Sequence, residues 1–427
     1  MFGRQSWSRT KRAAAACRST KSEFVMNRLS PLVAIFLTVF VDLVGFGIVI
    51  PLLPFYAEHF QAGPEMVTLV MAIYSFMQFF FSPIWGRLSD RYGRKPILLV
   101  SLAGISLSYV WTGYADGLVE LLAARALAGI MAGNIAAAQA YIADVTPPER
   151  RAQGMGLIGA AFGLGFIVGP ALGGVLAGAD PHNPHVVAPA LSSAALSLVA
   201  LVFALVFLKE SLDPEARREA AETPRAGRFS LLASAWRDGE LRLLVVLFFL
   251  VTFAFAGLEA TFAMWSERVF GWGATQNGYL FAYAGVLAVL VQGGLMRKLA
   301  AAFGEKRLLI QGALALALGL GLIPFAHSLP LLLVAMALVA YGGGTSNPSL
   351  SSLISLSAAK TMRGSVLGIS QSAASLARIL GPAFAGAVFT LAGRNGPYVA
   401  GAAVMLLVLV LAIRLERRGA LQATDAA

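Results

Sequence analysis

The sequence predicts an all-α membrane protein with twelve transmembrane helices, arranged as two six-helix halves with both termini in the cytoplasm. Composition is the first observation, since 58% of the residues are hydrophobic and only 13% are charged. The second is the number of apolar stretches that approach the roughly 20 residues needed to span a bilayer. The third is the uneven distribution of Lys and Arg between the connecting loops. A soluble multi-helix core does not need this much apolar surface, and we set that alternative aside.

Twelve apolar stretches are candidate spans. Several contain Gly or Pro, which membrane helices tolerate when neighbouring groups satisfy the freed backbone. The candidates lie near residues 32–56, 66–86, 97–115, 118–142, 153–177, 189–208, 243–265, 276–296, 308–326, 330–354, 364–390 and 397–413.

The basic residues set the predicted orientation. With the N-terminus in the cytoplasm, 29 of the 33 Lys and Arg fall on the cytoplasmic side. Arg268 and Arg394 fall in outer loops, and Arg125 and Arg378 lie inside spans. This asymmetry follows the positive-inside rule. The net charge of +11 is therefore explained by topology, and we expect no nucleic-acid partner.

An internal repeat predicts the two halves. At an offset of 212 residues, Gly169-Pro170 matches Gly381-Pro382, and Gly174 matches Gly386. Six spans in each half then run in the same orientation, as in a parallel repeat. We divide the chain into an N-terminal tail (1–29), an N-terminal half (30–209), a cytoplasmic linker (210–241), a C-terminal half (242–415) and a cytoplasmic tail (416–427).

The N-terminal tail has two interpretations. Residues 1–25 are rich in Arg, Ser and Ala, with Glu23 the only acid, and they faintly resemble an organellar transit peptide. We favour the alternative that the natural chain starts at Met26. The single cysteine, Cys17, excludes an intrachain disulfide.

A charged hairpin separates the second and third spans. Residues 86–96 read Gly-Arg-Leu-Ser-Asp-Arg-Tyr-Gly-Arg-Lys-Pro, and glycines permit a tight turn. This run resembles the loop between the second and third helices of major facilitator superfamily transporters. A basic loop that only sets topology is the alternative. The resemblance implies a gate network rather than a substrate site, formed by Gly86, Asp90, Arg91, Gly93, Arg94, Lys95 and Asp144, the last at the end of the fourth span.

Two ionisable residues inside spans suggest proton coupling. Asp42 lies among paired glycines and two prolines (residues 40–54), and Arg125 begins Arg-Ala-Leu-Ala-Gly-Ile-Met-Ala-Gly. A charge at mid-bilayer costs at least ~2.5–3.5 kcal/mol on insertion scales. Both motifs resemble those of tetracycline-type drug:proton antiporters, and this resemblance implies a proton-coupling role. The alternative is an ion pair that joins helices. Gly129 and Gly133 share one face, where we expect another helix to pack closely.

The fifth span carries a glycine-rich motif, Gly159-Ala-Ala-Phe-Gly-Leu-Gly-Phe-Ile-Val-Gly-Pro-Ala-Leu-Gly-Gly174. It resembles the motif that marks antiporters within the superfamily. We expect its small-residue face to pack against a helix of the other half, which would limit leakage. Its marked residues are Gly165, Gly169, Pro170, Gly173 and Gly174.

Glu259, in the seventh span, is a third candidate for proton coupling. It could instead provide the counter-charge for a cationic substrate or pair with Arg378. Polar and aromatic residues suggest a large apolar cavity that suits amphiphilic ligands, although each amide could equally form an interhelical hydrogen bond. The candidate cavity residues are Tyr74, Gln78, Asn134, Gln139, Trp265, Asn347, Gln371 and Arg378.

The predicted function is proton-driven export of small amphiphilic, tetracycline- or drug-like compounds by a multi-pass protein of the cell membrane. The resemblance implies a bacterial inner membrane. Its expected partners are the substrate, protons and the lipid bilayer, and we expect a monomer that is not an enzyme. The alternatives are a proton symporter for uptake of a metabolite and a non-transporting scaffold or receptor. The sequence has no Gly-x-x-x-x-Gly-Lys-Ser/Thr run, so we expect no nucleotide. It offers no metal-ligand spacing, and we expect no cofactor.

Overall fold

The computed structural model describes residues 30–147, 151–178, 180, 185–212, 239–357 and 363–425. Within these ranges the chain is helical apart from short connections, and twelve helical segments are long and apolar enough to cross a membrane. The predicted all-α fold with twelve spans is confirmed. The tail before residue 30 and residues 213–238 of the predicted linker lie outside the described residues.

The N-terminal half contains six spans. The first is built from three consecutive pieces and the fourth from two, whereas the others are single helices. They are α2 (Pro31–Val49), η1 (Ile50–Leu52) and α3 (Leu53–His59); α4 (Pro64–Tyr92); α5 (Arg94–Gly113); α6 (Leu118–Met131) and α7 (Asn134–Val145); α8 (Arg151–Ala177); and α9 (Val187–Phe207).

The C-terminal half repeats this plan. Its eighth span is interrupted by a π-helical turn, and its last helix continues through most of the predicted tail. The segments are α12 (Gly239–Phe270); α13 (Ala274–Val289), η3 (Leu290–Leu295) and α14 (Met296–Phe303); α15 (Glu305–Leu322) and η4 (Ile323–Phe325); α16 (Leu329–Ser357); α17 (Arg363–Ala392); and α18 (Gly396–Asp425).

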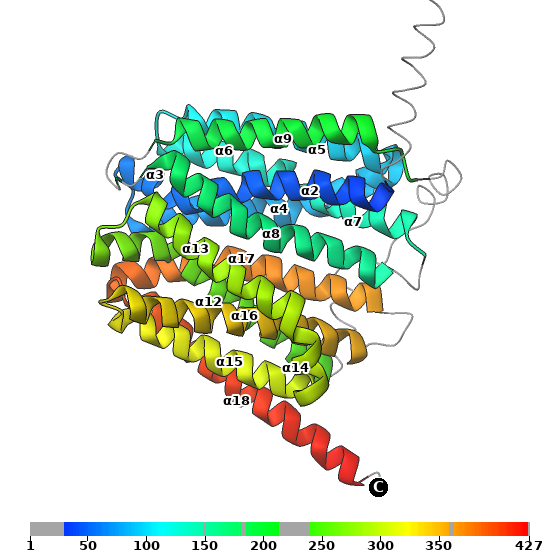
Figure 1. Cartoon of the computed structure of the whole chain (residues 1–427), viewed down its shortest axis with the longest axis vertical. Coiled ribbons are helices and arrows are strands. Elements are labelled where there is room, and N and C mark those ends of the chain that lie inside the picture. The colour runs from blue at the N-terminus through cyan, green and yellow to red at the C-terminus, as the bar shows by residue number, and fades with distance from the viewer. Residues whose placement is uncertain are drawn as a thin grey trace, which may run out of the picture.

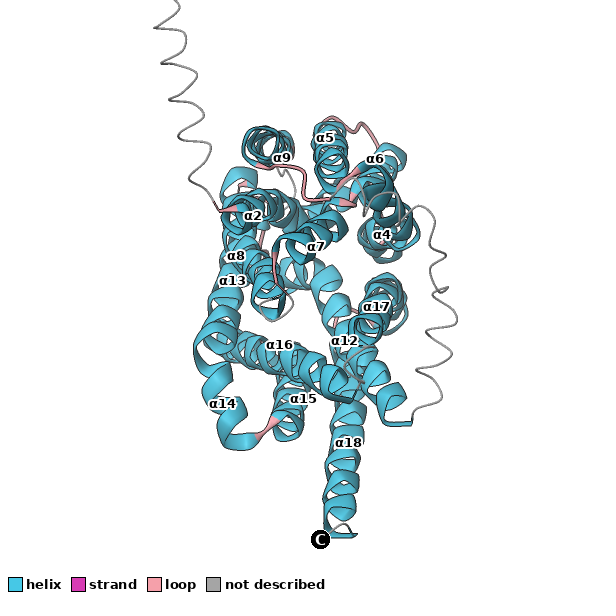
Figure 2. Cartoon of the chain, turned by 90° about the vertical axis from the view of Figure 1, so that its right-hand side faces the viewer, coloured by secondary structure: helices cyan, strands magenta, loops and turns pink. Residues whose placement is uncertain are grey.

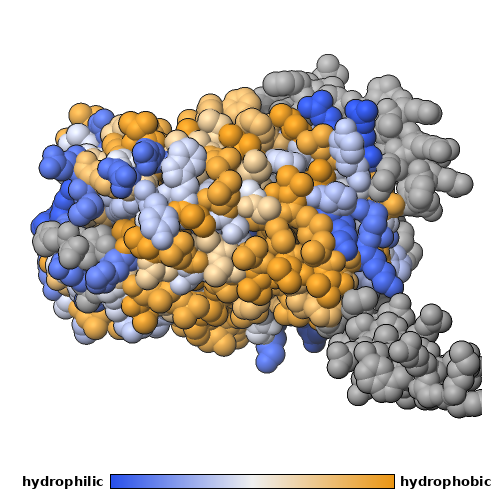
Figure 3. Space-filling model, turned by 90° about the horizontal axis from the view of Figure 1, so that it is seen from above, coloured by the Kyte–Doolittle hydropathy of each residue, from blue (hydrophilic) through white to orange (hydrophobic). Residues whose placement is uncertain are grey.

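The two halves lie one above the other in Figure 1, with α8 next to α13 at their junction. Seen end-on in Figure 2, α8 and α13 lie on one side of the junction and α4 and α17 on the other. Apolar side chains cover the middle of the surface in Figure 3, and polar side chains gather at both ends. This distribution is the one a bilayer-spanning bundle requires.

The charged hairpin is tighter than the sequence suggested. Helix α4 runs through Gly86 to Tyr92, and α5 begins at Arg94, so Gly93 alone makes the turn. Gly93 has φ +107°, a backbone conformation that favours glycine. Gly86 is therefore a helical residue with open space around it, and its predicted role in the turn is wrong. Gly304 makes the equivalent turn in the second half, with φ +75°.

These two turns mark one end of the bundle, which we call the Arg94 end. The other end carries Glu58, and we call it the Glu58 end.

The fourth span breaks between α6 and α7, where the sequence suggested one continuous helix. The break leaves carbonyl groups without their helical partners. The indole N–H of Trp85 donates to the carbonyl of Ile130, and the hydroxyl of Ser101 donates to that of Met131. These side chains satisfy the freed backbone, which is how a broken helix is tolerated within a membrane.

Candidate functional site

Asp42 lies in the middle of α2 and is buried, with 4% of its surface exposed. Its carboxylate accepts hydrogen bonds from Ser197 Oγ of α9 at 2.8 Å and from the amide of Asn134, the first residue of α7. The amide oxygen of Asn134 accepts from the backbone N–H of Ile135, which turns its amino group toward Asp42. Both donors are neutral, so the carboxylate has no counter-charge within ion-pair distance among the described residues.

Arg125 of α6 makes no ion pair with Asp42. Only 2% of the Arg125 surface is exposed, and its guanidinium carbon lies 4.9 Å from the centre of the Tyr74 ring. The Nε–H has no hydrogen-bond partner among the described residues. The alternative in which Asp42 and Arg125 form an ion pair is therefore wrong for this conformation. A buried cation without a carboxylate is costly unless another group compensates it.

Tyr74 of α4 packs this cluster against two neighbouring helices of the N-terminal half. Its ring packs against Phe46 of α2, with ring centres 5.2 Å apart. Its backbone carbonyl faces Gly129, where a side chain would collide with it. The close approach of another helix expected at Gly129 is thus made by α4, and Gly133 packs on Trp85 of the same helix.

Glu259 of α12 and Arg378 of α17 are the ionisable pair of the second half. They interact electrostatically, but their charged atoms lie beyond the 4.0 Å of an ion pair. The Arg378 guanidinium makes one long hydrogen bond, 3.4 Å to Ser375 Oγ, and it also interacts electrostatically with Tyr74. No described residue forms a hydrogen bond or ion pair with the Glu259 side chain. Tyr74 therefore interacts with an arginine of each half, by stacking with Arg125 and electrostatically with Arg378.

The Arg94 network joins three helices at one end of the N-terminal half. The buried guanidinium of Arg94 lies 2.6 Å from Asp90 and 3.0 Å from Asp144, and it donates to Ser89 Oγ at 2.7 Å. The structure thus brings together three residues of the predicted gate. Lys95 Nζ donates to the Leu205 carbonyl.

Arg91 lies outside this network. It is exposed at the end of α4, with its guanidinium 5.5 Å from the centre of the Tyr92 ring.

Glu210 belongs to the same network and was missed at the level of sequence. Its carboxylate accepts from the backbone N–H groups of Arg94 at 2.8 Å and Lys95 at 3.2 Å. These are free donors at the start of α5, where a negative charge is favourable. Ser211 Oγ donates to Asp144 at 3.0 Å. The sequence offers one signal for such a residue: Gly93, which precedes α5, has no side chain that could cap the helix, so a group from elsewhere in the chain can do so.

The glycine face of α8 packs differently from the prediction. Gly165, Gly169 and Gly173 face α2 of the same half, and a methyl group added at Gly169 would lie 2.6 Å from the Cα of Gly47. The expected partner from the other half is wrong for these three residues, because the stripe at i, i+4, i+8 is filled by the first span. Pro170 lies within α8, and its carbonyl faces Gly278 of α13.

Gly174 contacts the other half, whereas Gly165, Gly169 and Gly173 do not. A methyl group there would lie 2.7 Å from the carbonyl oxygen of Ala274 in α13. The repeat has the same geometry: Gly381 packs on Phe253 of α12, within its own half, and Gly386 packs on Thr68 of α4, across the junction. The matched glycines thus occupy equivalent positions in the two halves.

The remaining cavity candidates divide into two groups. The prediction that Trp265 lines a cavity is wrong. Its side chain is 1% exposed, packs among aromatic rings, and donates from Nε1 to Asn395 Oδ1 at 2.9 Å. The four other amides are partly or largely exposed and form no hydrogen bond with a described residue. They are Gln78, Gln139, Asn347 and Gln371.

Polar contacts join the two halves at the Glu58 end. Arg268 Nη2 of α12 lies 3.2 Å from Glu58 Oε1 of α3, and Thr275 Oγ1 donates to the Gly174 carbonyl at 2.6 Å. An apolar cluster seals the same region, with members from both halves: Leu52, Phe55, Ala177, Ala263 and Ala274. The bundle is therefore closed at this end.

Two repeated six-helix halves with ionisable groups inside their spans are the architecture of a membrane transporter. The chain belongs to the Major Facilitator Superfamily, whose family model matches residues 35–301 and 295–426. It is 33% identical to the class C tetracycline resistance protein of Escherichia coli over 392 residues, which cover 90% of this chain and 96% of that protein. It is 31% identical to major facilitator superfamily domain-containing protein 10 of Bos taurus, covering 87% of this chain and 90% of that protein.

Among solved structures, the human organic anion transporter MFSD10 (TETRAN) matches with a TM-score of 0.68 and 28% identity. The match covers 89% of this chain and 98% of that structure.

Proposed function

We propose that this transporter exports small amphiphilic compounds in exchange for protons, with both termini and the Arg94 end in the cytoplasm. The observation that carries the proposal is Asp42, a buried carboxyl held by two neutral donors, Ser197 and Asn134. Neutral donors leave its charge uncompensated, so its protonation can respond when the surroundings open to either side of the membrane. The similarity to tetracycline resistance proteins supports export.

The conformation fits one stage of this cycle. If the Arg94 end is cytoplasmic, the contacts of Glu58 with Arg268 and of Gly174 with Thr275 close the outer side. Substrate would then enter from the cytoplasm and displace the proton. Rocking of the halves would break the Glu58 contacts, expose Asp42 to the outer side and allow it to take up a proton as the substrate leaves.

The experiment is transport by proteoliposomes with and without an imposed pH gradient. A compound panel that includes tetracycline is first tested by counterflow, which needs no gradient. An acidic compartment on the Glu58 side should then drive the compound into it. Movement of the compound together with protons, out of that compartment, would instead identify a symporter.

Organic anion transport is the second candidate. The similarity to MFSD10 favours it, as does the uncompensated Arg125 guanidinium. The same panel separates the candidates when anionic and neutral compounds are compared.

A further inference from the structure

The fourth span is broken directly before Asn134, the residue whose amide donates to Asp42. Helix α6 ends at Met131 and α7 begins at Asn134. In an uninterrupted α-helix the Ile130 carbonyl would accept from the N–H of Asn134, and the Met131 carbonyl would accept from the N–H of Ile135. The break therefore frees two carbonyl groups and two N–H groups inside the bundle, where each needs another partner.

Side chains from two neighbouring helices donate to the two freed carbonyl groups. The indole N–H of Trp85, in α4, donates to the carbonyl of Ile130, and the hydroxyl of Ser101, in α5, donates to that of Met131. The Trp85 ring lies directly against the broken backbone, because a methyl group added at Gly133 would collide with it. Trp85 and Ser101 thus stabilise the break from outside the span.

The break also determines how the Asn134 side chain is oriented. The freed N–H of Ile135 donates to the amide oxygen of Asn134 at 2.9 Å. With its oxygen held there, the amide presents its amino group to Asp42. In an uninterrupted helix the Met131 carbonyl would already accept from Ile135, so the amide oxygen of Asn134 would have no such donor. The contact with Asp42 therefore depends on the break.

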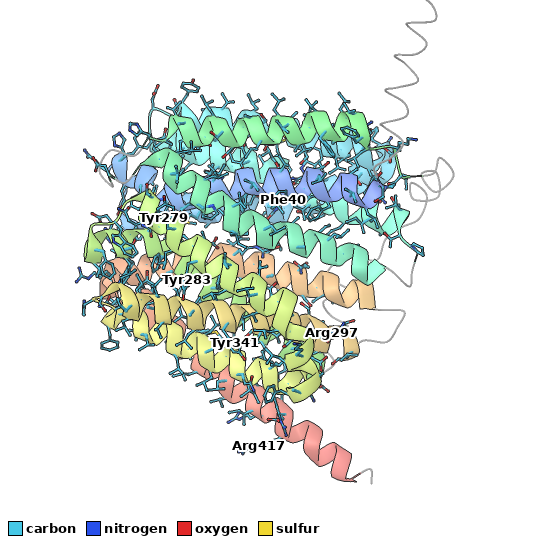
Figure 4. All side chains as sticks on the ribbon, in the orientation of Figure 1. Phe40, Tyr279, Tyr283, Arg297, Tyr341 and Arg417 are labelled. Atoms are coloured by element: carbon cyan, nitrogen blue, oxygen red, sulfur yellow. The ribbon has the colours of Figure 1, made fainter. Side chains whose placement is uncertain are left out.

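The C-terminal half provides an internal comparison. At the repeat offset of 212 residues, Arg297 replaces Trp85 and Ala313 replaces Ser101. Arg297 is exposed on α14 (Figure 4) and forms no hydrogen bond with a described residue, and alanine has no side-chain donor. The matching span, α16, continues as a helix through residues 343–346. The break is thus present in the half that has the two donors and absent from the half that lacks them.

We propose that Trp85 and Ser101 are positioning residues of the proton site. By donating to the two freed carbonyl groups, they stabilise the break that keeps the Asn134 amide on Asp42. Both act through Asn134, as supporting residues do when they fix the orientation of a functional group. This inference rests on the proposed function, in which Asp42 is the proton carrier.

Infrared difference spectra of the detergent-purified full-length chain, acidified minus neutral, test this proposal. The band that disappears in Asp42→Asn belongs to the protonated carboxyl of Asp42, and its wavenumber rises when the C=O loses a hydrogen-bond donor. Asn134→Ala gives the shift caused by losing the amide. Trp85→Phe, which keeps a ring against Gly133, and Ser101→Ala should each shift the band in the same direction. Neither should add to the shift when combined with Asn134→Ala.

Two control variants remove the same chemical groups elsewhere on α5. Trp111→Phe replaces an indole that is 39% exposed, and Ser108→Ala removes a hydroxyl that donates within its own helix, to the Ile105 carbonyl at 2.7 Å. Both should leave the band unchanged, and equal shifts in the controls would refute a specific role. If Trp85→Phe does not fold, Ser101→Ala decides alone.

The outcomes separate this proposal from the proposed function. A band that moves in Trp85→Phe and Ser101→Ala, without pH-driven transport by the wild type, supports the positioning role and removes proton exchange. Proton-driven transport with a band that neither variant moves keeps the function and overturns the positioning role. If Asp42→Asn removes no band, Asp42 takes up no proton, and both proposals are wrong.

Discussion

Arg268 and Glu58 form an ion pair between the two halves, 3.2 Å from Nη2 to Oε1, at the end of the bundle where the halves meet. The Arg268 guanidinium also lies 4.7 Å from the centre of the Phe389 ring, and its backbone carbonyl accepts from Arg394 at 2.8 Å. Arg268 therefore links α12, α17 and α3. This arrangement must break for the Glu58 end to open.

Removing the charge of either residue of this pair should favour opening of the Glu58 end. Its side chains are partly exposed, so the expected coupling is about 0.2–1 kcal/mol. The test uses a chain that carries Cys17→Ser and Ala274→Cys, so that its one cysteine replaces a buried residue at this end. Adding Glu58→Gln should make this cysteine react faster with an impermeant thiol reagent than it does without that change. Arg268→Gln should increase the rate similarly, and the double variant should add little. Additive rates would show that the two residues act separately.

The close contact between α2 and α8 should be sensitive to one methyl group. At Gly169 an added Cβ would lie 2.6 Å from Gly47 Cα, whereas at Gly159, on the same helix, it would meet nothing within 4 Å. Gly169→Ala should therefore lower stability by about 1–3 kcal/mol. Thermal unfolding in detergent measures the difference, and Gly159→Ala is the matched control. Equal melting temperatures would show that the helices separate at little cost.

The sequence predicted the fold more completely than the packing. Long apolar spans and basic loops depend on local composition, so twelve helices and the repeat of Gly169 and Gly381 could be predicted. The partner of Gly169 could not, because a small-residue face shows only that something packs closely there.

Similar reasoning applies to the site. Asp42 and Arg125 stand out because charges are rare within spans. Ser197 does not, since a serine in an apolar helix can as easily donate to its own backbone, as Ser193 does to the Pro189 carbonyl. Trp265 was misplaced because aromatic composition does not separate a core from a cavity wall.

Replacing Asp42 by asparagine should uncouple transport from protons. Asparagine keeps the size of the side chain and can still bond to Ser197 and Asn134, but it cannot take up and release a proton at this position. The variant should insert and fold, with pH-gradient-driven transport reduced to background. Substrate-induced proton release in detergent measures the coupling directly. Wild-type release from the variant would remove Asp42 from the mechanism.

The Arg94 network should act on conformational change more than on binding. Asp90→Ala removes the 2.6 Å contact with the buried Arg94 and leaves Asp144 as its remaining acid at 3.0 Å. We expect a loss of about 1–3 kcal/mol in stability and a slower transport rate with little change in substrate affinity. Arg91→Ala, at an exposed neighbouring position, is the control. A large loss of affinity with unchanged turnover would contradict the gate assignment.

Glu259 offers a final distinction between a structural and a functional acid. Its side chain has no hydrogen-bond or ion-pair partner among the described residues, and Arg378 acts on it only from a distance. Glu259→Gln should therefore change stability little, because no close ion pair is lost. If it provides the counter-charge for cations, the variant should weaken binding of the cation 1-naphthylmethylammonium and spare the neutral 1-naphthylacetamide. If Glu259 and Arg378 are instead a structural pair, Glu259→Gln should lower the melting temperature, because it leaves Arg378 uncompensated. Glu259→Gln with Arg378→Gln should then restore the melting temperature. Melting temperatures of the two variants decide between these outcomes, because only a structural pair predicts recovery in the double variant.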